Sequence, residues 1–338
     1  MEELSARRKK LFAGAPFQTA LLYSGDDPGA QNASFQYFSG CSVDGSYLLL
    51  KKNSGRLLVH EMNFGQAKDI SPYPVQLLGK DRAKDIRKAA GRGKVGIIAG
   101  EVSAARFFAL KKNAKLRLVE ADGRAFTVRG EKSASEMKAL AASAAIARRI
   151  LDSLDPWECK TESELATRLK MLALEKGDGI SFESIVSTGR NTSFPHHNAT
   201  NKKLGDAVLV DFGVRCKGYC SDFTRCYFKK KGRELETYEA CKEVFGEILE
   251  GLPECRKGKD VSLLSQKLLA AKGLPRLPHA IGHGIGLEVH EYPHLGRESN
   301  DALGAGTVLA IEPAAYFKGY GVRFEDMACC TKKGWKRL

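Results

Sequence analysis

The chain has 338 residues, which is long enough for about two domains that each bury a core of their own. Hydrophobic residues make up 43% of it and charged residues 28%, close to the averages of globular proteins, so extensive disorder is excluded. A transmembrane helix is excluded too, because about 18 uncharged apolar residues never occur in one run. The amino-terminal residues show no export signal, so we expect a cytoplasmic protein.

The formal net charge of +14 raises nucleic acid as a partner, because basic surfaces bind phosphate by releasing counterions. The lysines and arginines, however, are spread from Arg7 to Arg337 in short groups, without an aromatic-interleaved recognition motif. We therefore expect no specific binding of nucleic acid. The nine cysteines lack the paired C-x-x-C spacing of a zinc site, and their odd number does not suit a disulfide framework.

The first part of the chain alternates short apolar runs with helix-like stretches, a pattern typical of an α/β domain. Residues 47–50 and 57–59 flank a segment, 51–56, that is rich in turn residues, which predicts a hairpin. Residues 95–98 predict another buried strand. We expect a smaller α/β domain here.

The sequence changes character at residues 129–132, and we place a domain boundary there, with domains at 1–128 and 129–338. Directly after it, Ser133 and Glu136 form a capping box ahead of an Ala-rich helix. Apolar residues recur along this helix at spacings of three and four, giving one stripe suited to packing on a sheet.

The rest of the second domain repeats helices and strands. A second capping box, Thr161 with Glu164, predicts a helix that ends near Gly177. The fold class expected for this domain is therefore α+β. The further elements that we expect are strands around Ile185, Val208 and Phe223, helices at about 234–252 and 260–272, and strands that return at Thr307 and Gly321.

Two carboxylates stand on the first strand pair. Asp211 ends an apolar run and Asp222 lies on the following strand, while a buried acid needs a hydrogen-bonding, charged or metal partner. A turn centred between Cys216 and Lys217 would place the two acids directly opposite each other, and a shift of two would leave them diagonal on one face. Like charges that converge in this way favour a cation between them, although a slip of one residue would separate them.

Histidines and two more carboxylates follow. His283 lies between two glycines that allow close backbone approach, in the segment from His279 to Pro293, and local packing does not explain it. Glu312 closes a strand that begins at Thr307, and Glu325 is expected on an alternating strand from 321 to 330. Arg323 shares a face with Glu325, either as an ordinary surface ion pair or as a group that orients a metal-bound carboxylate.

Four carboxylates and one imidazole can together hold two divalent ions. Oxygen donors predominate in the set, which suits manganese or cobalt at least as well as zinc. Two metals with a bridging hydroxide are an established device for hydrolysis at neutral pH.

These segments resemble the pita-bread metallopeptidase family, which includes prolidase, aminopeptidase P and methionine aminopeptidase. The resemblance covers residues 133–338, where no motif of the metal set is missing, and the preceding part resembles a creatinase-like N-terminal domain. It implies a C-terminal pita-bread catalytic domain. The motifs that carry it are 211–213, 221–225, 279–293, 312–313 and 321–326.

The resemblance also implies a role for individual residues. Glu312 would serve as general base as well as ligand, and His196 and His290 would contact the substrate without binding metal. Arg323 and Thr224 would lie just behind the ligands. The implied metal ligands are Asp211, Asp222, His283, Glu312 and Glu325, holding two divalent ions, Mn²⁺ or Co²⁺ first and Zn²⁺ or Fe²⁺ as alternatives.

The activity implied is hydrolysis of Xaa-Pro peptide bonds through a metal-bridging hydroxide, in a proline dipeptidase that forms homodimers. One alternative is an Xaa-Pro aminopeptidase acting on longer peptides, and another is an inactive pita-bread protein that binds RNA or protein. The chain has His294 where some prolidases carry arginine. If an arginine there anchors a dipeptide carboxylate, His294, Arg297 or a residue of the N-terminal domain would have to replace it.

Overall fold

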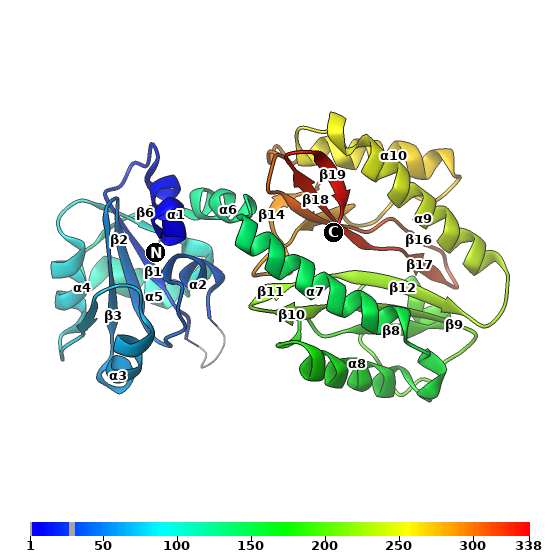
Figure 1. Ribbon diagram of the computed structural model, residues 1–338, viewed down its shortest axis with the longest axis horizontal. Coiled ribbons are helices and arrows are strands. Elements are labelled where there is room, and N and C mark those ends of the chain that lie inside the picture. The colour runs from blue at the N-terminus through cyan, green and yellow to red at the C-terminus, as the bar shows by residue number, and fades with distance from the viewer. Residues whose placement is uncertain (1, 27–30) are drawn as a thin grey trace. The chain divides into compact units, whose positions relative to one another are not determined.

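The computed structural model describes residues 2–26 and 31–338 (Figure 1). The chain divides into two compact units, Met1–Arg129 and Gly130–Leu338. Within the described ranges, none of the helices has both the length and the apolar character that crossing a bilayer requires.

The first unit is built on one mixed sheet with the strand order β4-β3-β2-β1-β5-β6. Strands β1, β2 and β3 are antiparallel, and the other neighbours are parallel. The strands are β1 (Thr19–Tyr23), β2 (Tyr47–Lys51), β3 (Ser54–Val59), β4 (Val75–Leu77), β5 (Lys94–Ile97) and β6 (Arg117–Glu120). The helices are α1 (Glu2–Phe12), α2 (Ala33–Ser39), α3 (Glu61–Ile70), α4 (Arg82–Ala90), the 3-10 turn η1 (Ala99–Glu101), α5 (Ala104–Lys112) and α6 (Asp122–Gly130).

The predicted hairpin of this unit is confirmed, with a shorter turn than expected. Lys51 pairs with Ser54 and Leu49 with Arg56, so most of the predicted turn segment is strand. Leucine side chains from both strands and from β1 form the core with Ile86, Ile97 and Leu110.

The first two long helices of the second unit begin at the capping residues predicted from the sequence. The capping box of Ser133 and Glu136 is present at the start of α7. At the next helix Thr161 accepts from the backbone of Glu164, but the Glu164 carboxylate accepts from Lys160 N at 2.5 Å, so this box is only half formed. The helices are α7 (Ala134–Asp152), η2 (Pro156–Glu158), α8 (Glu162–Lys176), η3 (Gly189–Ser193), α9 (Arg233–Gly251), η4 (Leu252–Glu254) and α10 (Gly258–Ala271).

The strands of the second unit form four antiparallel sheets, ordered β11-β10-β7, β12-β9-β8, β14-β13-β15-β18-β19 and β16-β17. The expected α+β class is confirmed. The earlier strands are β7 (Gly179–Ile180), β8 (Ile185–Thr188), β9 (Ala207–Phe212), β10 (Val214–Cys216), β11 (Tyr219–Cys220) and β12 (Phe223–Phe228). The later ones are β13 (Gly282–Gly284), β14 (Glu291–His294), β15 (Val308–Ile311), β16 (Ala314–Tyr316), β17 (Gly321–Arg323), β18 (Asp326–Thr331) and β19 (Gly334–Arg337).

The register between β9 and β12 corrects one prediction. Asp211 pairs with Thr224, so the arrangement with Asp211 directly opposite Asp222 is wrong and the diagonal one is right. The reason is the turn, because Lys217 and Gly218 both have positive φ and Cys216 pairs with Tyr219 around them. This two-residue turn moves the pairing by two residues and keeps both acids on one face.

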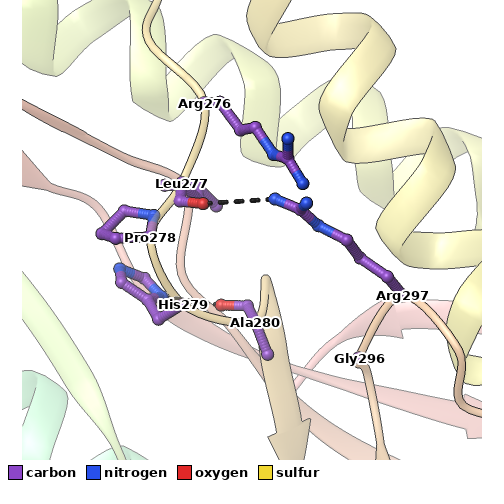
Figure 2. A pocket seen from close by; sticks show the side chains of 7 residues that line it. All are labelled: Arg276, Leu277, Pro278, His279, Ala280, Gly296 and Arg297. Carbon is purple, nitrogen blue, oxygen red and sulfur yellow. Dashed lines mark hydrogen bonds between the residues drawn. The ribbon is translucent and has the colours of Figure 1, made fainter.

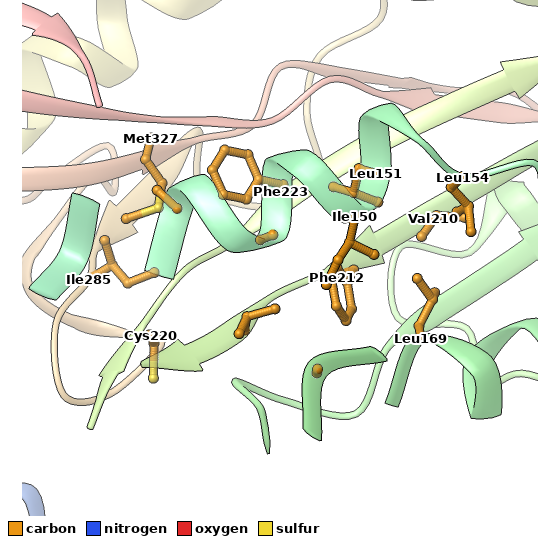
Figure 3. Packing of buried hydrophobic residues seen from close by; sticks show 14 of the residues in the cluster. Ile150, Leu151, Leu154, Leu169, Val210, Phe212, Cys220, Phe223, Ile285 and Met327 are labelled. Carbon is orange, nitrogen blue, oxygen red and sulfur yellow. The ribbon is translucent and has the colours of Figure 1, made fainter. Parts of the chain in front are cut away.

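A continuous core holds this sheet against α7 and α8 (Figure 3). Ile150 and Leu151 of α7 and Leu169 of α8 pack with the strand residues Phe212 and Phe223. The residues on the other face of the strands are thereby left to form a polar site.

Candidate metal centre

The five predicted ligands come from five separate segments. Asp211 lies on β9, Asp222 directly before β12, His283 in the middle of β13 and Glu312 directly after β15. The prediction of one continuous strand around Glu325 is wrong. Glu325 lies at the break between β17 and β18. The break arises because β17 pairs with β16 whereas β18 pairs with β15, so Glu325 stands where the chain changes sheet.

The segments meet around one cavity of about 180 Å³. Part of the cavity wall is apolar and consists of Phe182, Ile185, Pro195 and Val289. The predicted site residues that line the cavity are His196, Asp211, Asp222, His283, His290, Glu312, Arg323 and Glu325.

Glycines let the backbone close in around His283. A Cβ on Gly282 would lie 2.1 Å from the carbonyl oxygen of Ala310, and one on Gly284 would lie 2.4 Å from the backbone of Tyr292. Strand β13 is therefore held between β14 and β15 at a separation that only glycine permits on either side of the histidine.

Three of the predicted ligands form a compact group. One ligand atom each of Asp222, His283 and Glu325 lies within 4.8 Å of the others. His283 Nδ1 is 3.1 Å from the carbonyl oxygen of Gly284, and since a carbonyl only accepts, this nitrogen carries the proton. Nε2, which is 3.5 Å from Asp222 Oδ2, is then free to donate its lone pair to a metal.

The buried carboxylates of the cavity are unfavourable without a cation. Burial raises the pKa of Asp211, Asp222 and Glu325, and at Asp222 and Glu325 the charges of the neighbouring acids raise it further. One oxygen each of Asp211 and Asp222, Oδ1, is buried without a hydrogen-bond partner. The donor set therefore fits one or more divalent metal ions, which would neutralise the charge and occupy the unpaired oxygens.

Arg323 connects two of the predicted ligands, Asp211 and Glu325, through hydrogen bonds. Its Nη2 donates to Asp211 Oδ2 at 2.6 Å and its Nε to Thr224 Oγ1 at 2.9 Å, and that hydroxyl donates to Glu325 Oε2 at 2.7 Å. The guanidinium is 3% exposed, so the alternative of a surface ion pair is wrong. Its ion pair is with Asp211, and its hydrogen bonds reach Glu325 through Thr224.

The two histidines predicted to contact substrate, His196 and His290, line the same cavity. The rings of His283 and His290 have centroids 4.2 Å apart and meet edge to face. Burial, followed by the charge of His283, lowers the pKa of His290 to about 4, which makes it a neutral imidazole at neutral pH. His196 borders the same cavity from an exposed position.

One lining residue was missed by the sequence reasoning, which treated it only as the start of a motif. His279 Nδ1 is 3.7 Å from Glu312 Oε2, and its Nε2 is 3.1 Å from the hydroxyl of Tyr316. Its position four residues before His283 was the available signal.

The two residues predicted to bind a substrate carboxylate lie outside the cavity lining. His294 pairs with His283 across β13 and β14 and is exposed. Arg297 lines a neighbouring open pocket of about 570 Å³ together with Arg276 (Figure 2). His279 belongs to the lining of both hollows, so the pocket borders the cavity through this ring.

Comparison with known proteins places this site in a family. A model of metallopeptidase family M24 matches residues 136–332. An Xaa-Pro dipeptidase of Pyrococcus horikoshii is 30% identical over 320 residues, which cover 91% of this chain and 91% of the relative.

Two solved structures share the fold. An Xaa-Pro dipeptidase from Bacillus anthracis superposes with a TM-score of 0.86 at 26% identity, covering 99% of this chain and 96% of its own. An X-Pro aminopeptidase from Thermotoga maritima superposes with a TM-score of 0.84, covering 98% and 97%, and at 23% identity it shows the fold alone. The prediction from the motifs is confirmed: the chain belongs to metallopeptidase family M24.

Proposed function

We propose that this protein is a metal-dependent hydrolase that cleaves Xaa-Pro dipeptides. The observation that carries the proposal is the buried group of acids with unpaired oxygens, which shares its cavity with His196 and His290. The similarity to an Xaa-Pro dipeptidase along nearly the whole chain supports the choice of substrate.

Membership of a metallopeptidase family implies divalent metal ions. We propose two of them, manganese or cobalt, held by Asp211, Asp222, His283, Glu312 and Glu325, because oxygen donors predominate. Such ions, when bound, supply an activated water and polarise the scissile carbonyl.

The side chains around the ligands have separate tasks in this proposal. Glu312, which is 19% exposed at its side chain, accepts the proton of the attacking water. The neutral ring of His290 donates one N–H toward the carbonyl oxygen on which charge develops. His196 contacts the substrate at the mouth of the cavity.

Selectivity for proline has a physical basis in the cavity wall. The Xaa-Pro bond is a tertiary amide without N–H, so it cannot be held by backbone pairing as other peptide bonds are. The small cavity, with the apolar side chains of Phe182, Ile185 and Val289, suits a compact ring.

The pocket beside His279 is our candidate for the carboxylate end of the substrate. The guanidinium groups of Arg276 and Arg297 point toward one another in Figure 2, and Arg297 Nη2 lies 3.5 Å from the carbonyl oxygen of Leu277. Neither forms an ion pair in the part of the chain that the structure describes. Two converging cations without an acid favour an anion between them.

A peptide panel tests the proposal. After loading with Mn²⁺ or Co²⁺, the protein should cleave Ala-Pro much faster than Ala-Ala or an Xaa-Pro pentapeptide. Preference for the pentapeptide would instead establish an aminopeptidase, which the shared fold does not separate from a dipeptidase. No cleavage of any peptide would favour a binding module.

The carboxylate assignment needs its own control. Arg297→Gln should raise KM for Ala-Pro about fivefold, the worth of roughly 1 kcal/mol for an exposed charged contact, and should not affect Ala-Pro amide. Arg92→Gln, at an exposed site in the first unit, should change neither. Equal effects of Arg297→Gln on acid and amide would remove it from carboxylate recognition.

Four further assignments are proposals with simple tests. We propose that residues 1–128 are a creatinase-like domain and that residues 129–338 are the catalytic domain. We also propose that the protein is a homodimer, and sedimentation would test this oligomeric state. The nine free thiols suit a reducing cytoplasm, which fractionation would test. RNA affinity should be weak and strongly salt-dependent.

A further inference from the structure

Glu162, a buried acid outside the cavity, accepts hydrogen bonds from the segment that carries His196. Glu162 follows the N-cap residue of α8, is 0% exposed, and lies outside the cavity lining. Its carboxylate accepts five hydrogen bonds. They come from Thr188 N (3.0 Å), Asn191 Nδ2 (2.9 Å), His197 Nε2 (2.9 Å), Thr200 N (3.1 Å) and Thr200 Oγ1 (2.7 Å).

The donors all belong to one stretch of chain, residues 188–200. This stretch leaves β8, forms η3 and carries His196 next to the donor His197. Its side chains at Phe194, His196 and Thr200 are exposed, whereas Thr192 between them and β8 is buried. One buried carboxylate therefore ties both ends of this segment, Thr188 and Thr200, to the start of α8.

The charge of Glu162 is stabilised by this arrangement. Burial raises the pKa of a carboxyl group, but the hydrogen bonds from Thr200, His197 and Asn191 outweigh it and hold the pKa of Glu162 below its ordinary value. The acid is ionised at neutral pH and acts only as an acceptor, which matches five donors.

The same segment also forms two hydrogen bonds with residues of β17, the strand that carries Arg323. Gly321 N donates to Thr192 Oγ1 at 2.8 Å, and Arg323 Nη1 is 3.4 Å from the carbonyl oxygen of Pro195. His196 thus lies in a segment that is hydrogen-bonded to Glu162 on one side and to Arg323 on the other.

We propose that Glu162 is a positioning residue for His196, acting through the segment 188–200. The inference rests on the proposed function, since it requires His196 to contact substrate. Glu162→Gln keeps the shape but turns an amide NH₂ toward backbone and side-chain donors, so the segment loosens. We expect kcat/KM for Ala-Pro to fall about tenfold, with metal content unchanged.

A double-mutant cycle separates positioning from general destabilisation. In the His196→Ala background, Glu162→Gln should cause almost no further loss, because the residue through which it acts is gone. Full additivity of the two losses would overturn the proposal. Glu136→Gln is the matched control, a buried glutamate at the start of α7, and its effect should be small and the same in both backgrounds.

Hydrogen exchange tests the physical link without reference to catalysis. Glu162→Gln should speed exchange within 188–200, whereas Glu136→Gln should not, and unchanged exchange there would overturn the proposal. If Glu162→Gln fails to fold, Thr200→Val, which removes one donor at an exposed site, should show both effects in smaller form. If the wild-type protein cleaves no Xaa-Pro peptide, the proposed substrate is wrong, while the exchange result still decides whether Glu162 holds the segment.

Discussion

Two kinds of buried carboxylate stand within the second unit, and they differ in what surrounds them. Asp211, Asp222 and Glu325 face one another, and their pKa values are raised by burial and, at Asp222 and Glu325, by mutual repulsion. Glu162 is as deeply buried, yet its donors hold its pKa below the ordinary value.

Asp326 belongs to the second kind although it is the neighbour of Glu325. It is 0% exposed and forms ion pairs with Arg148, Arg225 and Arg337. Burial of an acid therefore says little about its role. An acid whose oxygens are all satisfied by the protein holds structure, whereas an acid left with an unpaired oxygen among other acids awaits a cation.

The largest loss of activity is expected from a substitution among the mutually repelling acids of the cavity. Asp222→Asn should lower peptide hydrolysis at least about 100-fold, because a neutral amide is a poor ligand for a hard dication. The metal-free variant should unfold no more easily than the metal-free wild type, since one repelling charge has gone. Metal analysis beside urea unfolding checks both, and an active variant with full metal would remove Asp222 from the site.

The predicted ligand His283 and its neighbour His290 should respond differently to substitution. His283→Ala should lose metal and activity together, and excess metal should partly restore both. His290→Ala should keep its metal and lose roughly 100-fold in kcat, a loss that added metal does not repair. Equal metal loss in the two variants would show that ligand and donor have been assigned wrongly.

The satisfied acid beside the site should give the opposite signature. Asp326→Asn leaves three arginines around a neutral group, so we expect unfolding free energy to fall by about 3 kcal/mol. Metal content at saturating metal should remain, because the ligands are intact. Loss of metal without loss of stability would place Asp326 among the ligands.

The smallest effect is a dependence on pH. The folded-state pKa of Glu162 lies below the ordinary value of 4.5, so its stabilisation is present above that value and is lost as the pH falls through the folded pKa. The unfolding free energy of the wild type should therefore fall more steeply than that of Glu162→Gln as the pH is lowered below about 5. Parallel curves would mean that the five hydrogen bonds are not charge-assisted.

Local features of the sequence could be predicted correctly. The long helices were predictable because caps and apolar spacing are local, as with Ser133 and Glu136. The candidate ligands were recognisable because their motifs are short and continuous, although their roles stay predictions.

Longer-range features were not predictable. The register at Asp211 depended on which two residues form the turn, and the break at Glu325 depended on which strands β17 and β18 choose as partners. Glu162 drew no attention because its donors lie 26 to 38 residues away in sequence, while its neighbour Glu164 matched a local capping pattern.

The turn at Lys217 and Gly218 sets a limit on how this protein can be altered. Surface turns commonly accept extra residues, and Lys217 in this turn is exposed. Its length, however, decides which face of the sheet carries each side chain after it, so one added residue would turn Asp222 away from Asp211. A library of insertions at this turn, selected for peptide hydrolysis, should return changes of residue type but no insertion of a single residue, which restricts where a tag or a loop can be grafted.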